Sequence, residues 1–506
     1  MIFRFTEALK YSLSRYKGNT AFFIQGHKYS YSDLEREIAR IQHIILEHIP
    51  ENEKYIGLVH FDDIETYAAI YALWFSGKAF VLISRNNPSS RNTQIIRDMN
   101  LSFLINSQDI PSFSIPEGNV NFIKTTGCGI AEHTVREIKY NDTDDAYVLF
   151  TSGSTGTPKG VPVSFRNLNA FLEGFMTSAG TFSEEDRFLQ VYDLSFDASV
   201  PCYTIPLLAG GSIYTVSPGE IKFLSAYRLI KDHKLTVIKM TPSMLTLLQP
   251  WFHTIRLDHV RHCMFGGEAF SSKLAAAWEK CVPNALIQNV YGPTEATVIC
   301  LFYNWNRAKN AGKSYNNVVA LGQTFGRNSI EIVDDDLLPV KGTGKGELLI
   351  SGDQVMKGYW NRLTGHDDGF IYLEKNNQQL KYYRTGDIVF KDHEGDIFYC
   401  GRKDSQVQIQ GYRVELGEIE KHARDYCGER NLLAMTKENP EGNFEIHLFV
   451  EGEYTDAALI GEYLSSRLPF YMMPEKIHNV RIFPRQTSGK TDRESLLNLL
   501  TDYSDD

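Results

Sequence analysis

A glycine- and hydroxyl-rich loop follows an apolar strand pattern at Tyr147–Gly160, with the sequence Tyr-Val-Leu-Phe-Thr-Ser-Gly-Ser-Thr-Gly-Thr-Pro-Lys-Gly. Glycines let a backbone approach a ligand closely and point N–H groups into a concavity, and hydroxyls and Lys159 would complete a phosphate cradle. The spacing does not fit the Walker A pattern G-x-x-x-x-G-K-[ST]. The alternative is a flexible polar loop. The preceding strand and the lysine favour phosphate binding.

Five further segments place glycine beside charged or hydroxyl residues, in a fixed order along the chain. They are Asn289-Val-Tyr-Gly-Pro-Thr-Glu295, Tyr383-Arg-Thr-Gly-Asp387, Gly401-Arg-Lys-Asp404, Gly411-Tyr-Arg-Val-Glu-Leu-Gly-Glu-Ile-Glu420 and Pro484-Arg-Gln-Thr-Ser-Gly-Lys490. Together with the first loop, these segments resemble the motifs of the adenylate-forming enzymes. That family includes acyl-CoA synthetases, firefly luciferases and the adenylation domains of nonribosomal peptide synthetases.

The resemblance implies that a substrate carboxylate attacks the α-phosphorus of ATP and expels pyrophosphate. Two anions must meet in this reaction, so fixed positive charge and a metal ion are needed at the transition state. The implied cofactors are ATP and Mg²⁺, with Glu295 as the metal ligand. The implied ATP- and AMP-binding residues are Thr151, Ser152, Gly153, Ser154, Thr155, Gly156, Lys159, Asn289, Tyr291, Gly292, Thr294, Asp387, Arg402 and Lys490.

The implied catalytic residues are Thr294, Glu295 and Lys490, each with a simpler alternative. Thr294 would donate its hydroxyl to the α-phosphate, and Tyr291 would stack on adenine, whereas a bare Tyr-Gly-Pro turn would need neither role. Glu295 could instead be a solvent-facing glutamate at a helix start. Lys490 would swing in to bridge the carboxylate and the α-phosphate, although a lysine in such a loop is usually just solvated.

The ribose is expected to lie at Asp387, whose carboxylate can accept hydrogen bonds from two vicinal hydroxyls; a plain turn aspartate is the alternative. Arg402 is implied as the second ribose or phosphate contact. Asp404 is the implied hinge about which a small C-terminal domain rotates between two half-reactions. Gln408 occupies a position where related adenylation domains usually carry Lys.

Asp197, in Leu194-Ser-Phe-Asp-Ala-Ser199, narrows the class of substrate. In amino-acid-activating members of the family, the aspartate of Phe-Asp-x-Ser binds the α-ammonium, and a buried carboxylate needs such a partner. The resemblance therefore implies an α-amino acid. Besides Asp197, the implied pocket positions are Ala198, Pro201, Lys239, Met264, Gly266, Val290, Val298 and Ile299. Lys239 either faces this pocket and pairs with a carboxylate or amide side chain, or extends outward to solvent.

The whole chain most resembles stand-alone D-alanine–D-alanyl carrier protein ligases, although Gly266 stands where those enzymes carry Cys. Since no carrier or condensation domain follows Lys490, the expected acceptor is the phosphopantetheine thiol of a separate carrier protein. One alternative is an acyl-CoA or aryl-CoA ligase, which Asp197 disfavours. Another is a non-catalytic carrier-docking homologue, which the presence of Lys159, Glu295, Asp387 and Lys490 disfavours.

Alternating helix and strand patterns must position these residues, and they predict an α/β fold of layered, partly parallel sheets. A capping box at Ser32–Glu35 predicts the start of one helix, and short apolar runs at Ile56–Val59, Phe80–Ile83 and Phe103–Ile105 predict strands. Glycine-rich turns after about residue 320 predict a β-rich subdomain. We expect an AMP-binding core over residues 1–403 and a mobile C-terminal α+β domain over residues 404–506, which carries Lys490.

Composition excludes several other classes of protein. The chain has 506 residues, 52 Lys+Arg and 62 Asp+Glu, and a net charge of −10, which argues against a nucleic-acid footprint. Its seven cysteines are scattered and form no C-x-x-C pair, so neither a zinc site nor a disulfide framework is predicted. The most apolar stretch, Ala68–Ile83, is too short to span a bilayer and is expected to be a buried helix, a glycine stop and a core strand. We expect a cytoplasmic protein with no membrane insertion.

Overall fold

The computed structural model describes residues 3–108, 120–126, 134–153, 157–305, 312–360, 369–375, 377–428, 430–439, 443–452, 456–486 and 491–502. The chain divides into two compact units. The first comprises Met1–Arg85, Thr93–Thr151 and Lys159–Asp404, and the second comprises Asn86–Asn92, Ser152–Pro158 and Ser405–Asp506. Each unit is described by itself. The expected rotation of a C-terminal domain about Asp404 concerns movement and stays a prediction.

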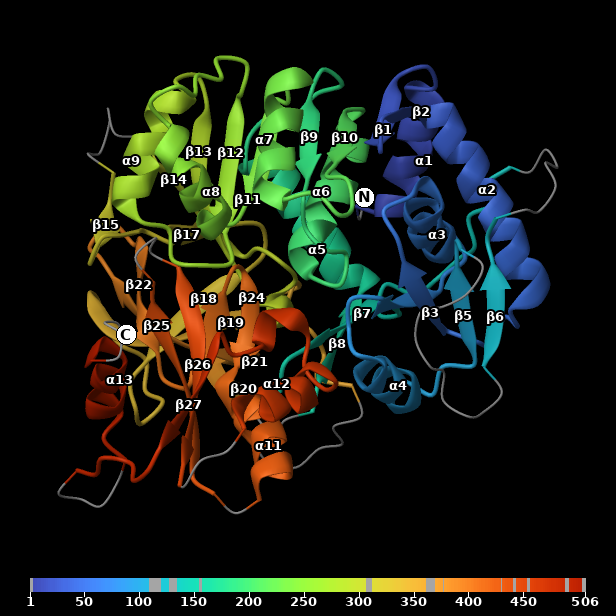
Figure 1. The fold of residues 1–506 in the computed structure, drawn as a ribbon. Helices are drawn as coiled ribbons and strands as arrows, with labels where there is room; N and C mark the ends of the chain where they lie inside the picture. The colour runs from blue at the N-terminus through green and yellow to red at the C-terminus, as the bar shows by residue number, and fades with distance from the viewer. Residues whose placement is uncertain are drawn as a thin grey trace. The chain divides into compact units, whose positions relative to one another are not determined.

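A nine-stranded sheet with a parallel centre forms one half of the first unit (Figure 1). Its order is β17 (Gln323–Thr324), β14 (Leu301–Trp305), β13 (Leu286–Tyr291), β12 (His262–Gly266), β11 (Val237–Met240), β9 (Arg187–Gln190), β10 (Ser212–Thr215), β1 (Thr20–Ile24) and β2 (His27–Ser30). The strands from β13 to β1 pair in parallel, and β2, β14 and β17 are antiparallel. A parallel sheet needs cover on both faces, which explains its continuous apolar strands.

Helices cover the two faces of this sheet, and the alternation of side chains along each strand decides which face each residue joins. Apolar side chains of α7 (Lys222–Asp232), α8 (Pro242–Leu248) and α9 (Ser272–Cys281) share a core with Ile238 and Met240 of β11. Val237 and Met264 belong to the other core, with α5 (Phe165–Ser178) and α6 (Val200–Ala209). Position 239 therefore faces the α6 side. Short helices η1 (Asp197–Ser199), η2 (Gln249–Trp251) and η3 (Thr294–Ala296) lie in the connections.

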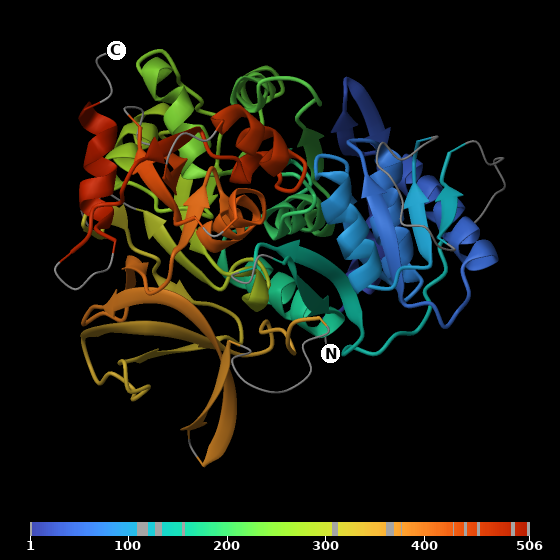
Figure 2. The same ribbon diagram turned by 60° about the horizontal axis from the view of Figure 1, so that its bottom comes forward.

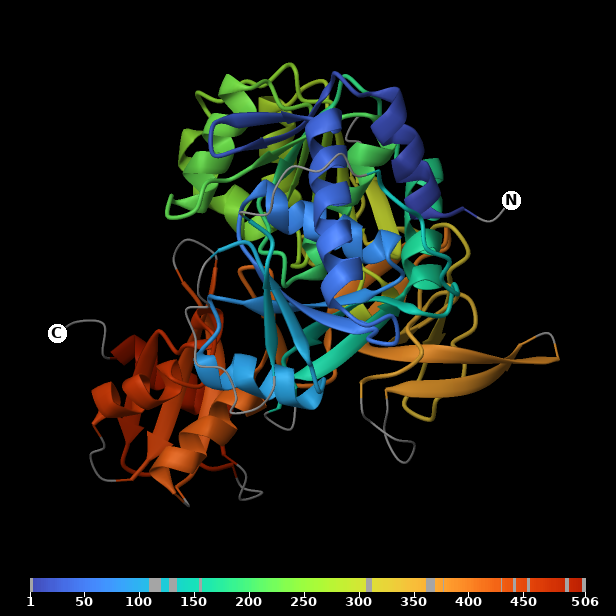
Figure 3. The same cartoon turned by 90° about the vertical axis from the view of Figure 1, so that its right-hand side faces the viewer.

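A six-stranded sheet forms the other half, in the order β6 (Asn121–Lys124), β5 (Phe103–Asn106), β3 (Tyr55–His60), β4 (Ala79–Ser84), β7 (Asp145–Thr151) and β8 (Lys159–Ser164). All its pairings are parallel except that of β7 with β8. Three of its neighbouring helices are α1 (Phe5–Arg15), α2 (Tyr31–His48) and α3 (Ile64–Phe75), which pack together on the side seen in Figure 3. A fourth, α4 (Ser89–Asp98), buries Ile95 and Ile96 against Val59 and Val81.

An antiparallel sheet of β18 (Ser329–Val333), β19 (Gly344–Ser351), β21 (Gln378–Lys391), β20 (Phe370–Lys375) and β22 (Ile397–Arg402) follows, and its long β20–β21 hairpin projects from it in Figure 2. A small ribbon joins β15 (Ser314–Tyr315) and β16 (Val318–Val319).

The second unit contains the hairpin β23 (Gln406–Ile409) and β24 (Tyr412–Glu415). It also contains the sheet β25 (Leu432–Glu438), β26 (Phe444–Glu451) and β27 (Lys476–Val480), with α11 (Leu416–Cys427), α12 (Ala457–Ser465), η4 (Phe470–Met472) and α13 (Arg493–Asp502).

The α/β class with layered sheets is confirmed, and so is the assignment of Ala68–Ile83 to a buried helix, a stop and a core strand. The predicted capping box at Ser32–Glu35 is wrong by two residues. Ser30 is the N-cap: its hydroxyl accepts a hydrogen bond from the Asp33 N–H, and the Asp33 side chain accepts one from the Ser30 N–H. The Asp33 side chain is one methylene shorter than the Glu of the usual pattern, but it closes the same reciprocal pair of hydrogen bonds. In the described part of the chain, no helix is both long enough and apolar enough to cross a membrane.

Candidate active site

A tight connection after β13 carries the predicted catalytic pair Thr294 and Glu295 on the short helix η3. β13 ends at Tyr291, so this connection leaves the carboxyl end of a central parallel strand, where open α/β sheets bind their ligands. A side chain at Gly292 would place its Cβ 2.6 Å from the Val298 carbonyl oxygen, which is why the turn needs glycine. Asn289 is buried below the turn and donates to the carbonyl oxygens of Val319 and Ala320.

The connection then passes through two consecutive left-handed residues, Thr297 (φ 56°) and Val298 (φ 71°). For a β-branched residue this backbone conformation is strained, and it persists only where surrounding contacts enforce it. Gln354 supplies those contacts. Its amide donates to the carbonyl oxygens of Ala296, Thr297 and Ile299, and its own backbone carbonyl accepts the Thr297 hydroxyl hydrogen bond at 2.6 Å.

Glu295 is only 1% exposed, so the alternative of a solvent-facing glutamate is wrong. The Tyr359 hydroxyl donates to Glu295 Oε1 at 2.6 Å, and the Met356 N–H donates to the Glu295 carbonyl at 2.9 Å. Lys159 lies with its ammonium 5.6 Å from the centre of the Tyr359 ring. Tyr359 therefore contacts both the predicted metal ligand and the predicted phosphate lysine.

Gln354 and Tyr359 were not among the predicted site residues. Both lie in Gly352-Asp-Gln-Val-Met-Lys-Gly-Tyr359, which follows β19 as a loop. Polar and aromatic residues between two glycines resemble any surface turn, and the partner of each is about 60 residues away in the sequence. Only the tertiary pairing of this loop with η3 reveals them.

Asp387 and Arg402 form a buried polar cluster with Tyr291. β21 and β22 pair Asp387 opposite Arg402, whose Nη1 donates to Asp387 Oδ1 at 2.7 Å. The Tyr291 hydroxyl donates to the second carboxylate oxygen at 2.5 Å, and burial, followed by the Asp387 charge, raises the pKa of Tyr291. Arg402 also pairs with Asp404 through Nε and Nη2, both at 2.7 Å. The alternative of a plain turn aspartate is therefore wrong for Asp387, which lies in a strand.

Asp197 begins η1, directly before α6, and one of its carboxylate oxygens lacks a partner. Oδ2 is buried and makes no hydrogen bond to any residue that the structure describes. Loss of solvent raises the pKa of Asp197 to about 6, against the Thr294 side chain and the Lys239 charge, which lower it. Such an orphaned acceptor is costly to bury, so it indicates a site for a donor brought by a ligand.

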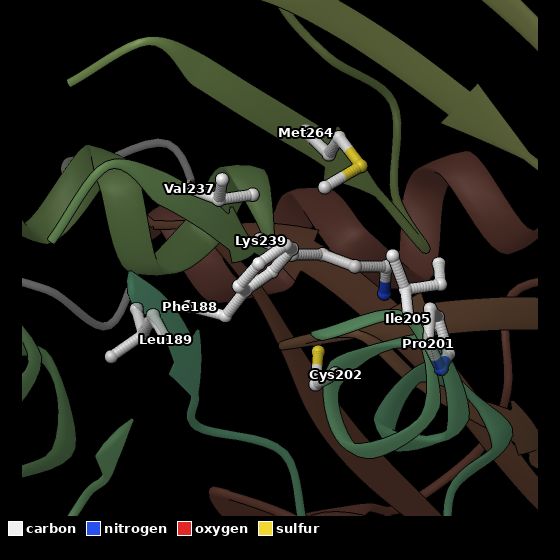
Figure 4. A pocket seen from close by; sticks show the side chains of 8 residues that line it. All are labelled: Phe188, Leu189, Pro201, Cys202, Ile205, Val237, Lys239 and Met264. Atoms are coloured by element: carbon white, nitrogen blue, oxygen red, sulfur yellow. The ribbon is translucent and has the colours of Figure 1, made fainter. Parts of the chain in front are cut away.

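Lys239 is 6% exposed, so the alternative of a lysine that extends to solvent is wrong. Its Nζ donates to the Ala198 carbonyl oxygen at 2.9 Å and lies 4.2 Å from the centre of the Tyr192 ring. Figure 4 shows its side chain crossing a cavity toward Pro201 and Ile205 of α6. The cavity measures about 10 Å³, room for about one water molecule.

Among the remaining predicted pocket positions, Met264 and Gly266 lie on β12 and Val290 on β13, whereas Val298 and Ile299 lie in the connection after β13. Gly266 on β12 pairs with Val290 on β13, and a Cβ at position 266 would lie 2.2 Å from the Val290 carbonyl oxygen. A cysteine here, as in D-alanine ligases, would require a shift of the β13 backbone. Met264, Val290, Val298 and Ile299 are buried in one apolar core.

The predicted phosphate loop is divided between the two units. Thr151 and Lys159 face each other across the β7–β8 pairing in the first unit. Ser152 and Gly153 belong to the second unit, where the Ser152 hydroxyl donates to the Arg413 carbonyl and the Gly153 N–H donates to Glu418. Gln408 lies on β23 of that unit. The predicted residues Ser154, Thr155, Gly156 and Lys490 lie outside the described residues.

The donor set around η3 fits an Mg²⁺ ion, because this ion takes carboxylate oxygens and Glu295 presents one from a buried, hydrogen-bonded position. A buried carboxylate of this kind needs a donor or a cation beside it, and Tyr359 supplies one donor. The first unit thus brings Glu295 and Lys159 together through Tyr359, and Asp197 interacts electrostatically with Lys239 and Glu295. This combination suits a reaction between a carboxylate and a nucleotide phosphate.

Comparison with known proteins also indicates an enzyme that binds a nucleotide. A family model described as "AMP-binding enzyme" matches residues 9–360. The chain is 29% identical over 487 residues to tyrocidine synthase 1 of Brevibacillus parabrevis, covering 94% of this chain and 43% of that protein. It therefore spans less than half the length of this curated relative.

Solved structures share the fold. PA1221, a nonribosomal peptide synthetase protein with adenylation and PCP domains, here in its holo form bound to a vinylsulfonamide inhibitor, gives a TM-score of 0.87 at 21% identity, covering 98% of this chain and 84% of that one. The Vibrio cholerae adenylation domain AlmE, in complex with glycyl-adenosine-5'-phosphate, gives 0.84 at 23% identity, covering 98% of both chains.

The family match defines the class as AMP-binding enzymes, and the solved adenylation-domain structures share the fold of this chain. The chain belongs to the AMP-binding enzyme family.

Proposed function

We propose that this AMP-binding enzyme is an ATP-dependent ligase, which activates an α-amino acid as its aminoacyl-adenylate and then transfers the aminoacyl group to the phosphopantetheine thiol of a carrier protein. The observation that carries the amino-acid assignment is the buried, unpartnered Oδ2 of Asp197, among the residues that the structure describes. An α-ammonium brings a charged donor for this oxygen. A fatty or aryl acid brings none, and would leave Oδ2 of Asp197 buried without a hydrogen-bond donor.

In the first half-reaction, an oxygen of the substrate carboxylate forms a bond to the α-phosphorus of ATP. The bond from the α-phosphorus to the bridging oxygen breaks, and pyrophosphate leaves. Asp197 holds the ammonium, which orients the carboxylate. The Thr294 hydroxyl, which bonds to Asp197 in the ligand-free site, turns to donate to the α-phosphate once the ammonium occupies Asp197. Lys159 offsets phosphate charge beside Tyr359, and Lys490 bridges carboxylate and α-phosphate, a role that comes from the sequence resemblance.

Glu295 holds the Mg²⁺ ion in this proposal, and a bound Mg²⁺ supplies charge neutralisation for the phosphate oxygens of the transition state. Tyr359 keeps one Glu295 oxygen in place through its hydrogen bond. Asp387 and Arg402 lie together in one hydrogen-bonded cluster, and there they bind the ribose hydroxyls. Tyr291, which donates to Asp387, presents its ring to the adenine.

In the second half-reaction, the carrier's thiolate sulfur forms a bond to the carbonyl carbon of the adenylate. The carbonyl carbon–oxygen bond to the phosphate breaks, and AMP leaves. The carrier protein as acceptor is supported by PA1221, a protein with adenylation and PCP domains. D-Alanine is not part of this proposal, because Gly266 stands where D-alanine ligases carry Cys, and a Cβ at this position would lie 2.2 Å from the Val290 carbonyl oxygen.

ATP–pyrophosphate exchange across L- and D-amino acids, short fatty acids and aryl acids tests the first half-reaction. We expect exchange with at least one amino acid, and loss of discrimination between an amino acid and its deaminated analogue in Asp197→Ala. Exchange driven only by acids that lack the amine would overturn the proposal in favour of an acyl-CoA or aryl-CoA ligase. Absence of exchange with every acid, in a protein that still folds, would favour a non-catalytic homologue.

Lys490→Ala separates the two steps. We expect it to abolish amino-acid-dependent exchange while it spares transfer from a pre-made adenylate to a carrier protein. Unchanged exchange in this variant would remove Lys490 from the first half-reaction.

A further inference from the structure

Tyr359 lies between two residues that are held by contacts outside the candidate active site. The ammonium of Lys357, two residues before it, pairs with Asp145 Oδ2 at 3.0 Å. Trp360, the residue after it, donates its backbone N–H to the Gly160 carbonyl oxygen at 2.9 Å. The segment that carries Tyr359 is therefore anchored on both sides of the tyrosine.

Tyr55 connects the two anchors. Its hydroxyl donates to the same Asp145 oxygen at 2.7 Å, and its ring meets the Trp360 ring edge to face, with the ring centroids 4.6 Å apart. Tyr55 begins β3 and Asp145 begins β7, so both lie at the amino ends of parallel strands of the six-stranded sheet. Burial, followed by the hydrogen bond to Asp145, raises the pKa of Tyr55, so its hydroxyl stays protonated and donates.

The Asp145 carboxylate depends on these two donors. Its side chain is 1% exposed, and its Oδ1 has no hydrogen-bond partner among the residues that the structure describes. A buried carboxylate without a paired cation is costly, so Asp145 holds the Lys357 ammonium in place even though the lysine side chain is 60% exposed. The pair is therefore a stronger restraint than an ion pair between two exposed side chains, which contributes little.

The restraint at Lys357 reaches the candidate Mg²⁺ ligand through the backbone of the loop. Met356, directly before Lys357, donates its N–H to the Glu295 carbonyl oxygen at 2.9 Å, and Tyr359 donates its hydroxyl to Glu295 Oε1 at 2.6 Å. Between these two contacts, the Lys357 carbonyl oxygen accepts a hydrogen bond from the Lys381 ammonium at 2.6 Å. A displaced Lys357 would therefore move the tyrosine hydroxyl away from Glu295.

We propose that Lys357 and Asp145 are positioning residues, which set the place of the Tyr359 hydroxyl and thereby of the Glu295 carboxylate that holds Mg²⁺. This proposal rests on the proposed function, because it takes Glu295 as the metal ligand. Asp145 lies at the amino end of β7, whereas the predicted phosphate loop follows the carboxyl end of that strand. The pair therefore acts through the loop and not on the substrate.

Lys357→Met removes the ammonium and keeps the length of the side chain. We expect the Mg²⁺ concentration for half-maximal pyrophosphate exchange to rise about fivefold, as for the loss of one partly buried ion pair. Mn²⁺ affinity in the presence of ATP, followed by electron paramagnetic resonance, should fall to the same extent. Lys357→Arg keeps the charge and should titrate close to wild type. Lys375→Met, which removes an ion pair between β20 and Glu331, is the matched control.

A double-mutant cycle with Tyr359→Phe tests whether Lys357 acts through the tyrosine. In the Tyr359→Phe background, Lys357→Met should change the Mg²⁺ titration by less than about twofold, because the hydrogen bond that the lysine positions is already absent. Full additivity of the two changes would overturn the proposal. So would a Mg²⁺ titration and a Mn²⁺ affinity of Lys357→Met equal to those of wild type.

Asp145→Asn tests the other partner. It keeps an acceptor for Tyr55 and removes the charge that holds Lys357, so it should raise the Mg²⁺ requirement as Lys357→Met does. Chemical denaturation reports whether each variant is folded, and Lys357→Met should keep a midpoint close to wild type. An unchanged Mn²⁺ affinity in folded Asp145→Asn would overturn the positioning role alone. Exchange with no acid in the wild-type protein would instead overturn the proposed function, and Mn²⁺ binding, which needs no turnover, separates the two cases.

Discussion

The hydroxyl of Tyr359 donates a 2.6 Å hydrogen bond to Oε1 of Glu295. This contact joins a loop that follows the antiparallel sheet to the short helix at the end of β13, two parts of the chain 64 residues apart. It fixes one oxygen of the carboxylate that we assign to Mg²⁺. The adjacent Lys159 ammonium lies over the face of the same tyrosine ring.

Tyr359→Phe should weaken Mg²⁺ binding, because the Glu295 carboxylate loses the hydrogen bond that holds it in position. Loss of a hydrogen bond to a charged group costs about 1.5–3 kcal/mol, so we expect the Mg²⁺ concentration for half-maximal pyrophosphate exchange to rise about tenfold or more. Mn²⁺ binding followed by electron paramagnetic resonance, in the presence of ATP, should show the same shift. Tyr372→Phe, on the exposed β20, is the control and should titrate as wild type. Identical Mg²⁺ titrations for Tyr359→Phe and wild type would contradict the assignment.

Amino-acid affinity should fall on the acid side of pH 6. The pKa of Asp197 is raised to about 6 because its carboxylate has lost solvent, so the ammonium-binding anion is present above pH 6 and is lost below it. We expect the dissociation constant of the amino acid to rise toward about tenfold for each pH unit below 6, and to change little between pH 7 and 8. Calorimetric titration across this range provides the measurement. In Asp197→Asn the pH dependence should disappear together with tight binding, and its persistence would assign it to another group.

Asp387→Ala should weaken nucleotide binding and leave the fold intact. The variant removes the acceptor for Tyr291 and for Arg402, which keeps Asp404 as its partner. We expect AMP affinity to fall about 10–100-fold, as for the loss of one or two charged hydrogen bonds. Asp335→Ala removes an exposed ion pair with Lys403 and serves as the control. Equal AMP affinity in the two variants would argue against a ribose site at Asp387.

Gln354→Ala should destabilise the protein and the site together. It leaves the carbonyl oxygens of Ala296, Thr297 and Ile299 without their amide donor, and we expect the free energy of unfolding to fall by about 2–4 kcal/mol. Chemical denaturation measures this change. Gln379→Ala, on the exposed part of β21, should leave the denaturation midpoint unchanged. A Gln354→Ala midpoint equal to that of wild type would show that the strained turn holds without the amide.

The sequence predicted the layers of the fold because each strand and helix has its own local signal. The apolar runs at β3, β4 and β5, and the helix–glycine–strand stretch from Ala68 to Ile83, needed no tertiary information. The predicted start of α2 was two residues too late because two serines, Ser30 and Ser32, could each be the N-cap. Only the strand that ends at Ser30 decides between them.

Sequence motifs also singled out Glu295, Asp387 and Asp197 as candidate site residues, but not the residues that support the η3 connection and Glu295. Tyr359 and Gln354 act across about 60 residues of chain, and nothing in their local pattern marks a partner. The sequence alone did not decide which face of the sheet the Lys239 side chain points to, for a related reason. A lysine in a strand can face either layer, and its burial follows from the neighbours Ile238 and Met240, which fill the opposite core.

The left-handed backbone at Val298 limits how this enzyme can be redesigned for a new substrate. Position 298 is one of the implied pocket positions, and its φ of 71° is one that β-branched residues, Val298 included, tolerate poorly. Glycine and asparagine adopt this conformation readily, so libraries that enlarge the pocket at 298 should recover them, whereas isoleucine or threonine would keep the backbone strain. Variation at Met264, on the regular strand β12, carries no such backbone restriction and is the better first choice for directed evolution.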